Sequence, residues 1–158
     1  MKATVVPNRN MIMLSIAGGV AVADKANRIA IGVHAGDHFI YPDCRPEFIK
    51  FANAALFAGN VGFGNLDADA IFTPYIIGSK DDIALRALEL EVPLHETWSC
   101  YKGGSKHCGR CGTCVERLEA INNALVTYRR KHGTRRVDYT EYEDEAYWRQ
   151  ALVHQPTV

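Results

Sequence analysis

Four of the chain's five cysteines fall within fifteen residues: Cys100, Cys108, Cys111 and Cys114. The last three form two overlapping Cys-x-x-Cys pairs, in the segment HCGRCGTC. Tetrahedral zinc takes four soft ligands at about 2.3 Å, and cysteines separated by two residues can turn back onto one ion. Because four protein ligands leave no position for a reactive water, we interpret this group as a structural zinc site.

Other interpretations of the cysteines stay open but are less favoured. A Cys-x-x-Cys pair also lowers thiol pKa, so Cys108 and Cys111 could form a redox dithiol. Disulfides would require an oxidising compartment, and nothing else in the sequence suggests export. Free structural cysteines rarely gather so closely. His107 could replace one ligand, although four thiolates make this unnecessary.

A second group of reactive side chains lies in residues 34–45, with the sequence HAGDHFIYPDCR. The segment follows a predicted strand, and ligands of parallel α/β sheets bind beyond the carboxyl ends of the strands. Asp43 and Arg45 could clamp a polar substrate, because an arginine binds carboxylate or phosphate in a bidentate way. Asp37 could accept donors from a guanine-like ring or help to hold Mg²⁺. A solvated loop in which Asp and Arg pair with each other is equally compatible.

Two more cations and one more cysteine are candidates for chemistry. Arg9 precedes a predicted helix, and a helix N-terminus beside an arginine can bind phosphate. A capping Asn10 next to an exposed arginine is the simpler interpretation, which the spacing favours. Lys80 opens another predicted helix and is a weaker phosphate candidate. Cys44 is more typical of a small buried residue than of a nucleophile.

The elements that must position these residues alternate between helices and short strands. The predicted helices cover residues 10–23, 46–58, 79–90, 114–131 and 140–153. The first is apolar almost all round and is therefore expected to be buried. The predicted strands cover residues 28–33 and 70–73, which are short, continuous and apolar, as in buried parallel strands.

Capping signals support two of these helices. Ser79 with Asp82, and Thr140 with Glu143, have the spacing of a capping box. The alternation of strands and helices predicts an α/β fold with a parallel sheet. We expect one domain over residues 1–158. Its parts would be a nucleotide- and substrate-binding part (1–96), a zinc loop (97–117) and C-terminal helices (118–158).

Composition narrows the classes of function. The chain has 158 residues, enough for one domain with its own core. Its 18 basic and 18 acidic residues give no net charge, which argues against a nucleic-acid partner. No apolar run reaches the roughly 18 residues of a membrane span. The N-terminus has no signal-peptide pattern, so we expect a reducing cytoplasm.

The segments VPNRNMIMLSIA, IGVHAGDHFIYPDCRPEFI and HCGRCGTCVER resemble the 7-cyano-7-deazaguanine synthase family, which acts in the pathway to queuosine and related deazapurines. The resemblance extends from Val6 to about Arg117. It implies a fold similar to the PP-loop ATP pyrophosphatases. The implied reaction uses ATP and ammonia to convert the carboxylate of 7-carboxy-7-deazaguanine, through an amide, to a nitrile. It also implies a structural zinc on the four cysteines, and a nucleotide and substrate site lined by Arg9, Asp37, Asp43, Arg45 and Lys80.

One family feature is not found in the sequence. The phosphate-binding Ser-Gly-Gly-x-Asp-Ser loop belongs well upstream of VPNRN, and only five residues precede Val6 here. We therefore expect ATP and Mg²⁺ to bind only if a second chain supplies the loop. The chain would then be a truncation, half of a split enzyme, or a non-catalytic remnant that binds a deazapurine or a protein. An incomplete sheet exposes a strand edge, so a partner chain or a homodimer is expected.

Overall fold

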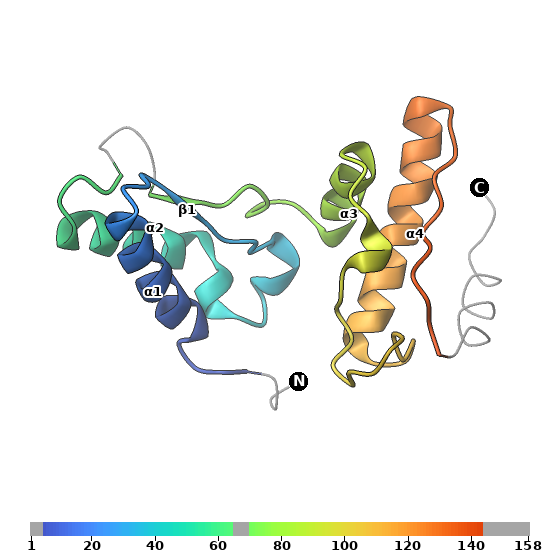
Figure 1. Ribbon diagram of the computed structural model, residues 1–158, viewed down its shortest axis with the longest axis horizontal. Coiled ribbons are helices and arrows are strands. Elements are labelled where there is room, and N and C mark those ends of the chain that lie inside the picture. The colour runs from blue at the N-terminus through green and yellow to red at the C-terminus, as the bar shows by residue number, and fades with distance from the viewer. Residues whose placement is uncertain (1–4, 65–69, 144–158) are drawn as a thin grey trace. The chain divides into compact units, whose positions relative to one another are not determined.

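The computed structural model describes residues 5–64 and 70–143 (Figure 1). The chain divides into two compact units, residues 1–79 and 80–158, and each is described by itself. The fold is α/β with a small parallel sheet, as the sequence predicts. The predicted three parts of one domain stay a prediction.

Unit 1 alternates helices and strands. Its elements are α1 (Arg9–Ala23), β1 (Ile29–Ala30), the 3-10 turns η2 (Ala35–Asp37) and η3 (Pro42–Cys44), α2 (Pro46–Gly59) and β2 (Ile71–Phe72). The two strands pair in parallel, with Ile29 opposite Ile71. Pro46 begins α2 because its fixed φ suits the first helical position, where a missing N–H costs nothing.

The two edges of this sheet differ. The Ile29 N–H donates to the carbonyl of Ala70, just before β2, at 2.8 Å, and the Ile31 N–H donates to the carbonyl of Phe72 at 3.0 Å. Because successive backbone groups of a strand point to opposite sides, Ala30 between them faces the outer edge of β1. The outer edge of β2 is closed at Ile71, whose N–H donates to Oδ1 of Asn53 at 3.1 Å. Among the described residues, no strand pairs with the outer edge of β1, which we call the open edge.

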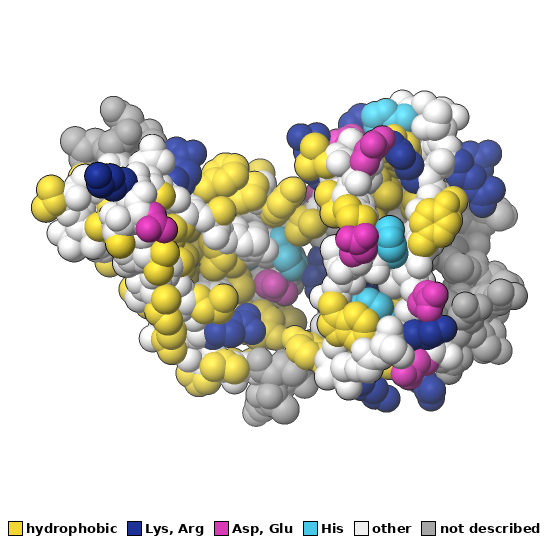
Figure 2. All heavy atoms as spheres, viewed as in Figure 1, with side chains coloured by type: hydrophobic (Ala, Val, Ile, Leu, Met, Phe, Trp, Pro, Cys, Tyr) yellow, Lys and Arg dark blue, Asp and Glu magenta, His cyan; other side chains and the backbone are white. Residues whose placement is uncertain are grey.

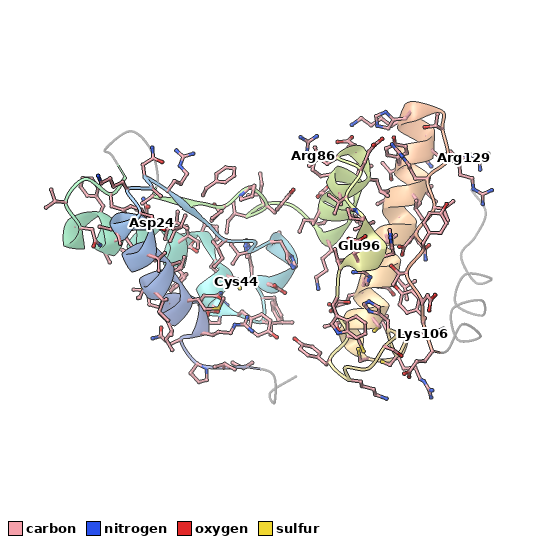
Figure 3. All side chains as sticks on the ribbon, in the orientation of Figure 1. Asp24, Cys44, Arg86, Glu96, Lys106 and Arg129 are labelled. Carbon is pink, nitrogen blue, oxygen red and sulfur yellow. The ribbon has the colours of Figure 1, made fainter. Side chains whose placement is uncertain are left out.

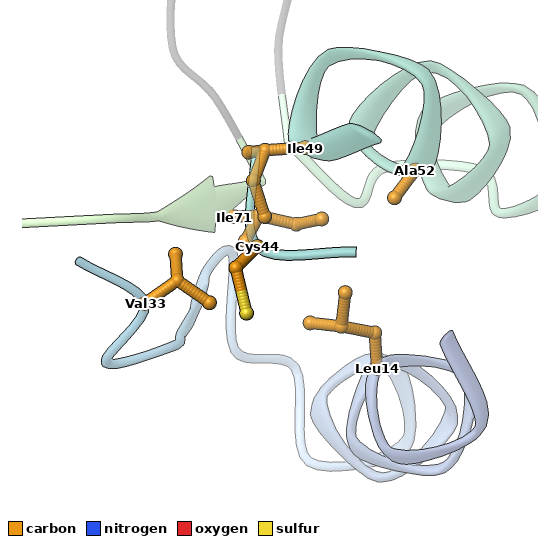
Figure 4. Close-up of a cluster of buried hydrophobic side chains, with 6 residues drawn as sticks. All are labelled: Leu14, Val33, Cys44, Ile49, Ala52 and Ile71. Atoms are coloured by element: carbon orange, nitrogen blue, oxygen red, sulfur yellow. The ribbon is translucent and has the colours of Figure 1, made fainter. Parts of the chain in front are cut away.

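One face of α1 packs into the core of unit 1, which Figure 4 shows. The buried side chains of this cluster are Leu14, Val33, Cys44, Ile49, Ala52 and Ile71. The opposite face of α1 is open, since Ile12, Met13 and Ile16 are 52%, 60% and 66% exposed. Figure 2 shows hydrophobic side chains over this part of unit 1.

The expectation that α1 is buried all round is therefore wrong. An apolar pattern shows that a helix could be buried, but it does not show whether other segments pack on every face. In the described part of the chain, partners cover one face only.

Unit 2 is built on a helix pair. Its elements are α3 (Lys80–Glu89), the 3-10 turn η4 (Leu94–Glu96) and α4 (Gly112–His132). The two helices pack through a buried cluster of Ala84, Leu88, Ala120, Ile121, Ala124 and Tyr128. Gly133 ends α4 as predicted: its φ is 69°, and its N–H donates to the Arg129 carbonyl at 2.9 Å. Glycine occupies this left-handed position without the steric cost of a Cβ.

The predicted capping box at residues 140–143 is wrong. The Glu143 N–H donates to the His107 carbonyl at 2.7 Å, so it is not available to Thr140. Tyr142 forms an isolated parallel bridge with His107, and this pairing replaces the local cap. The rest of the predicted helix, residues 144–153, lies outside the described residues. Within the described ranges, no helix combines the length and the apolar character needed to cross a bilayer.

Candidate metal centre and polar pocket

The four clustered cysteines converge in unit 2, in the loop between η4 and the start of α4. Their Sγ atoms all lie within 4.8 Å of one another, and those of Cys108 and Cys114 are 4.0 Å apart. A tetrahedron with metal–sulfur bonds of about 2.3 Å has sulfur–sulfur edges of about 3.8 Å. The donor set therefore fits a metal such as zinc with only a small contraction.

Backbone N–H groups point at the sulfur atoms. Cys108 donates to Sγ of Cys100 at 3.4 Å, and Cys111 and Arg110 donate to Sγ of Cys108 at 3.3 and 3.4 Å. Gly109 has a φ of 72°, which turns these N–H groups toward the sulfur without strain. Such donors stabilise thiolates, the form in which cysteine binds a metal.

The sulfur environments are unequal. Cys100, Cys108 and Cys114 are 5%, 2% and 0% exposed, whereas Cys111 is half-buried. Burial raises the pKa of Cys111, but its contact with the Thr113 hydroxyl and hydrogen bonds from nearby backbone N–H groups outweigh it and bring the pKa to about 6. Burial and the neighbouring Cys111 sulfur raise the pKa of Cys114 to about 12. Four thiolates therefore need a cation at their centre.

Arg117 on α4 fastens the segments around the cysteine loop. Its Nη1 donates to Oγ1 of Thr97 at 2.8 Å, and its Nη2 donates to the Leu94 carbonyl at 2.6 Å and to Oγ1 of Thr140 at 3.1 Å. No sequence pattern pointed to this residue, because its partners lie twenty or more positions away.

Aromatic side chains pack beside the sulfurs. The His107 ring is 4.3 Å from that of Trp98 and 5.3 Å from that of Tyr142, centroid to centroid. His107 is buried, and its Nδ1 lies 3.9 Å from Sγ of Cys114. On the surface of the same loop, Lys106 pairs with Glu141 at 2.9 Å (Figure 3). No sequence pattern predicted these contacts either.

Unit 1 holds a separate cavity of about 420 Å³ at the N-terminus of α1. We call it the α1 pocket. Its lining residues are 5–9, Tyr41, Pro42, Asp43 and Phe48. Two residues predicted to belong to the site, Arg9 and Asp43, meet here.

Asp43 is tied to α1 by two hydrogen bonds. Its Oδ2 accepts the Asn10 backbone N–H at 3.2 Å, and its carbonyl accepts Nδ2 of Asn10 at 3.0 Å. The helix N-terminus therefore already faces a carboxylate. The N-cap is Asn8, with a φ of 61°, so the interpretation of Asn10 as the cap is wrong.

Cys44 lies beside this contact, where Nδ2 of Asn10 is 3.4 Å from its Sγ (Figure 3). Burial, and then the charges of Asp43 and Asp37, raise the pKa of the Cys44 thiol. The thiol is therefore protonated near neutral pH. It is a small core residue, as predicted, and not an activated nucleophile.

Arg45 and Asp43 do not pair with each other in the described structure, which was the alternative to a role in substrate binding. Its Nε donates to the His38 carbonyl at 2.7 Å and holds the loop that follows β1. Asp37, on the same loop, has its Oδ2 3.2 Å from Nε2 of the buried His34. Both residues lie beyond the carboxyl end of β1, where the sequence analysis placed a site.

Lys80 belongs to unit 2 and is the first residue of α3. Its Nζ pairs with the carboxylate of Glu116 on α4. The roles predicted for Lys80 and the other site residues stay predictions.

Two comparisons with known proteins bear on this site. The family model described as "Queuosine biosynthesis protein QueC" matches residues 1–125. A 7-cyano-7-deazaguanine synthase of Agrobacterium fabrum (strain C58) is 52% identical over 148 residues, which cover 94% of this chain and 57% of the relative. One of Chelativorans sp. (strain BNC1) is 50% identical over 152 residues, or 96% of this chain and 60% of the relative.

A third relative, the 7-cyano-7-deazaguanine synthase of Sinorhizobium fredii (strain NGR234), is 51% identical over 148 residues. The match covers 94% of this chain and 57% of the relative. The chain thus spans less than two thirds of the length of these curated relatives.

Proposed function

The chain belongs to the family of the queuosine biosynthesis protein QueC, and from this premise we propose that it is the zinc-bearing part of a 7-cyano-7-deazaguanine synthase. The enzyme is an ATP-dependent ligase that converts 7-carboxy-7-deazaguanine and ammonia to the nitrile. The observation that carries the proposal is the 52% identity over 94% of the chain to a relative of that name.

The reaction activates a poor electrophile twice. A carboxylate oxygen attacks the α-phosphorus of ATP and releases pyrophosphate, and ammonia then displaces AMP to give the amide and a proton. The amide oxygen is adenylated in the same way, and loss of AMP and a proton leaves the nitrile. The first activation brings two anions together, the carboxylate and ATP, so the site must supply fixed positive charge and oriented donors.

The predicted site residues suit these tasks. Arg9 and Asp43 line the α1 pocket, and Asp37 and Arg45 lie on the loop beyond β1. In the proposed enzyme Asp43 and Arg45 act at the reacting groups, and Arg9, Asp37 and Lys80 bind substrate and nucleotide. Arg45 would approach the reacting groups from a loop that its own hydrogen bond to the His38 carbonyl holds in place.

The four cysteines would hold zinc as a structural ion. When bound, the ion supplies a fixed link among four thiolates and no open position for water. It would join residues 100–111 to the first turn of α4, where Cys114 lies. Its binding free energy would add directly to the stability of unit 2.

The phosphate-binding loop would come from polypeptide beyond these 158 residues, together with its ATP and Mg²⁺. The open edge of β1 and the uncovered apolar face of α1 support this, because parallel sheets are normally extended and covered on both sides. A second chain that carries the loop is the proposed partner. A homodimer is the alternative use of the same surfaces.

A turnover assay tests the proposal. The purified chain is incubated with ATP, Mg²⁺, ammonia and 7-carboxy-7-deazaguanine, alone and with the unmatched part of the Agrobacterium fabrum relative as a separate polypeptide. Mass spectrometry should detect the nitrile only in the second case. Turnover by the chain alone would contradict the proposed need for a partner.

The second candidate function is a zinc-stabilised module that binds a deazapurine or a protein without catalysis. The observation in its favour is that all four sulfur atoms converge within unit 2, so the proposed zinc site is complete without the predicted catalytic residues of unit 1. Binding of the deazapurine acid without turnover, whatever partner is added, would support it.

A further inference from the structure

The α1 pocket favours one of the two anions in the proposed reaction. We infer that it binds the deazapurine acid, with Arg9 on the carboxylate, and that the triphosphate of ATP binds elsewhere. The inference rests on the proposed function and assigns one of its substrates to a cavity.

Charge is the first argument. Among the described lining residues, Arg9 is the one cation, and its side chain has no hydrogen bond or ion pair within the described part of the chain. A single guanidinium matches a single carboxylate in a bidentate way. A triphosphate carries several negative charges and needs more cations than this pocket offers.

The second argument is the occupied helix N-terminus. Backbone N–H groups at that position normally attract phosphate. Here the Asn10 N–H already donates to Oδ2 of Asp43 at 3.2 Å. A phosphate at the same place would meet the Asp43 carboxylate and be repelled by it.

Shape is the third argument. Apolar and aromatic side chains, Tyr41, Pro42 and Phe48 with residues 5–7, form most of the lining. A cavity of about 420 Å³ is of the size that binds a small organic ligand, and flat ring systems stack on aromatic side chains. A planar heterocycle with one charged substituent fits such a lining better than a flexible polyanion.

Asp43 also has a function in this arrangement. Its Oδ2 is bound to Asn10, and the carboxylate retains further acceptor capacity. The amino-pyrimidinone edge of a guanine-like ring presents N–H donors, which a carboxylate accepts well. Arg9 and Asp43 would therefore recognise two different features of one molecule. This arrangement assigns Asp43 to the ring in place of the reacting group, where Arg45 would then act without it.

Calorimetry on the full chain tests the inference. The ligands are 7-carboxy-7-deazaguanine, the neutral 7-cyano-7-deazaguanine and Mg-ATP. Arg9→Gln should weaken binding of the acid at least tenfold and leave the nitrile within about twofold, because only the acid carries the charge that Arg9 meets. The matched control is Arg28→Gln, since Arg28 lies 5.8 Å over the Phe72 ring and does not line the pocket. It should change neither affinity.

Three results would overturn the inference. They are unchanged acid binding in Arg9→Gln, equal weakening of acid and nitrile, and weakening of Mg-ATP binding in place of acid binding. Thermal melting of each variant shows whether equal weakening comes from a loss of folding. If the parent chain, alone or with its partner, binds neither deazapurine, the proposed function itself fails.

Discussion

The four cysteines of the metal centre differ in burial and in hydrogen bonding. Cys114 is fully buried at the start of α4, whereas Cys111 is half-buried and receives a contact from the Thr113 hydroxyl at 3.2 Å. The spacing of the four cysteines was enough to predict that they converge. The spacing could not predict which sulfur is most acidic, because that depends on burial and on contacts such as that with Thr113.

The Cys111 thiol should be the first to react in metal-free, reduced protein. Its pKa of about 6 lies below the ordinary value of 9.0. Ionisation of Cys111 therefore stabilises the folded state fully above pH 9.0, and this stabilisation is lost as the pH falls through about 6. Iodoacetamide labelling followed by mass spectrometry should modify Cys111 first, with a half-maximal rate near pH 6. First labelling of Cys114, or a midpoint near pH 9, would contradict this prediction.

Single elements were the most predictable part of the structure, where the signal is local. Pro46 and Gly133 mark helix ends through their own backbone preferences, and the predicted strands both form. The contacts of Arg117 and Asn53 were not predictable, because each joins segments eighteen or more residues apart. Tertiary pairing also replaced the expected cap at Thr140.

The C-terminal glycine of α4 should be sensitive to substitution. Gly133→Ala places a Cβ at a φ of 69° and should lower the free energy of unfolding by about 1 kcal/mol, which thermal melting by circular dichroism can measure. Gly112→Ala is the matched control. Gly112 does not have a positive φ, and an added Cβ would have no neighbour within 4 Å, so the melting temperature should be unchanged or higher. Equal loss in both variants would contradict the assignment.

At the scale of the whole molecule, the chain consists of two units, each with a hydrophobic cluster of its own. In the described residues of unit 1, the β1 edge and one face of α1 are open, and in unit 2 four sulfur atoms converge. The spacing of the cysteines predicted the sulfur cluster, and the loop not found in the sequence predicted an exposed strand edge. No pattern within α1 indicates which of its faces lacks a cover. Whether that face of α1 is covered depends on the polypeptide that packs against it.

Metal removal should affect one unit more than the other. A chelator should raise the rate of hydrogen exchange in residues 97–117, which include the start of α4, because thiolates without a cation repel one another. The helices of unit 1 should exchange as before. Cys44→Ala is the control, since Cys44 lies in the core of unit 1 and should keep the metal content of the parent. Uniform loss of protection across both units would contradict the local role of the metal.

The claim that supports the whole account is that four thiolates hold one zinc ion in unit 2. Metal analysis of freshly purified, reduced chain, combined with X-ray absorption spectroscopy, tests it directly. We expect one zinc per chain with four sulfur neighbours at about 2.3 Å. Protein that is folded but free of zinc, or zinc with nitrogen or oxygen among its ligands, would contradict it.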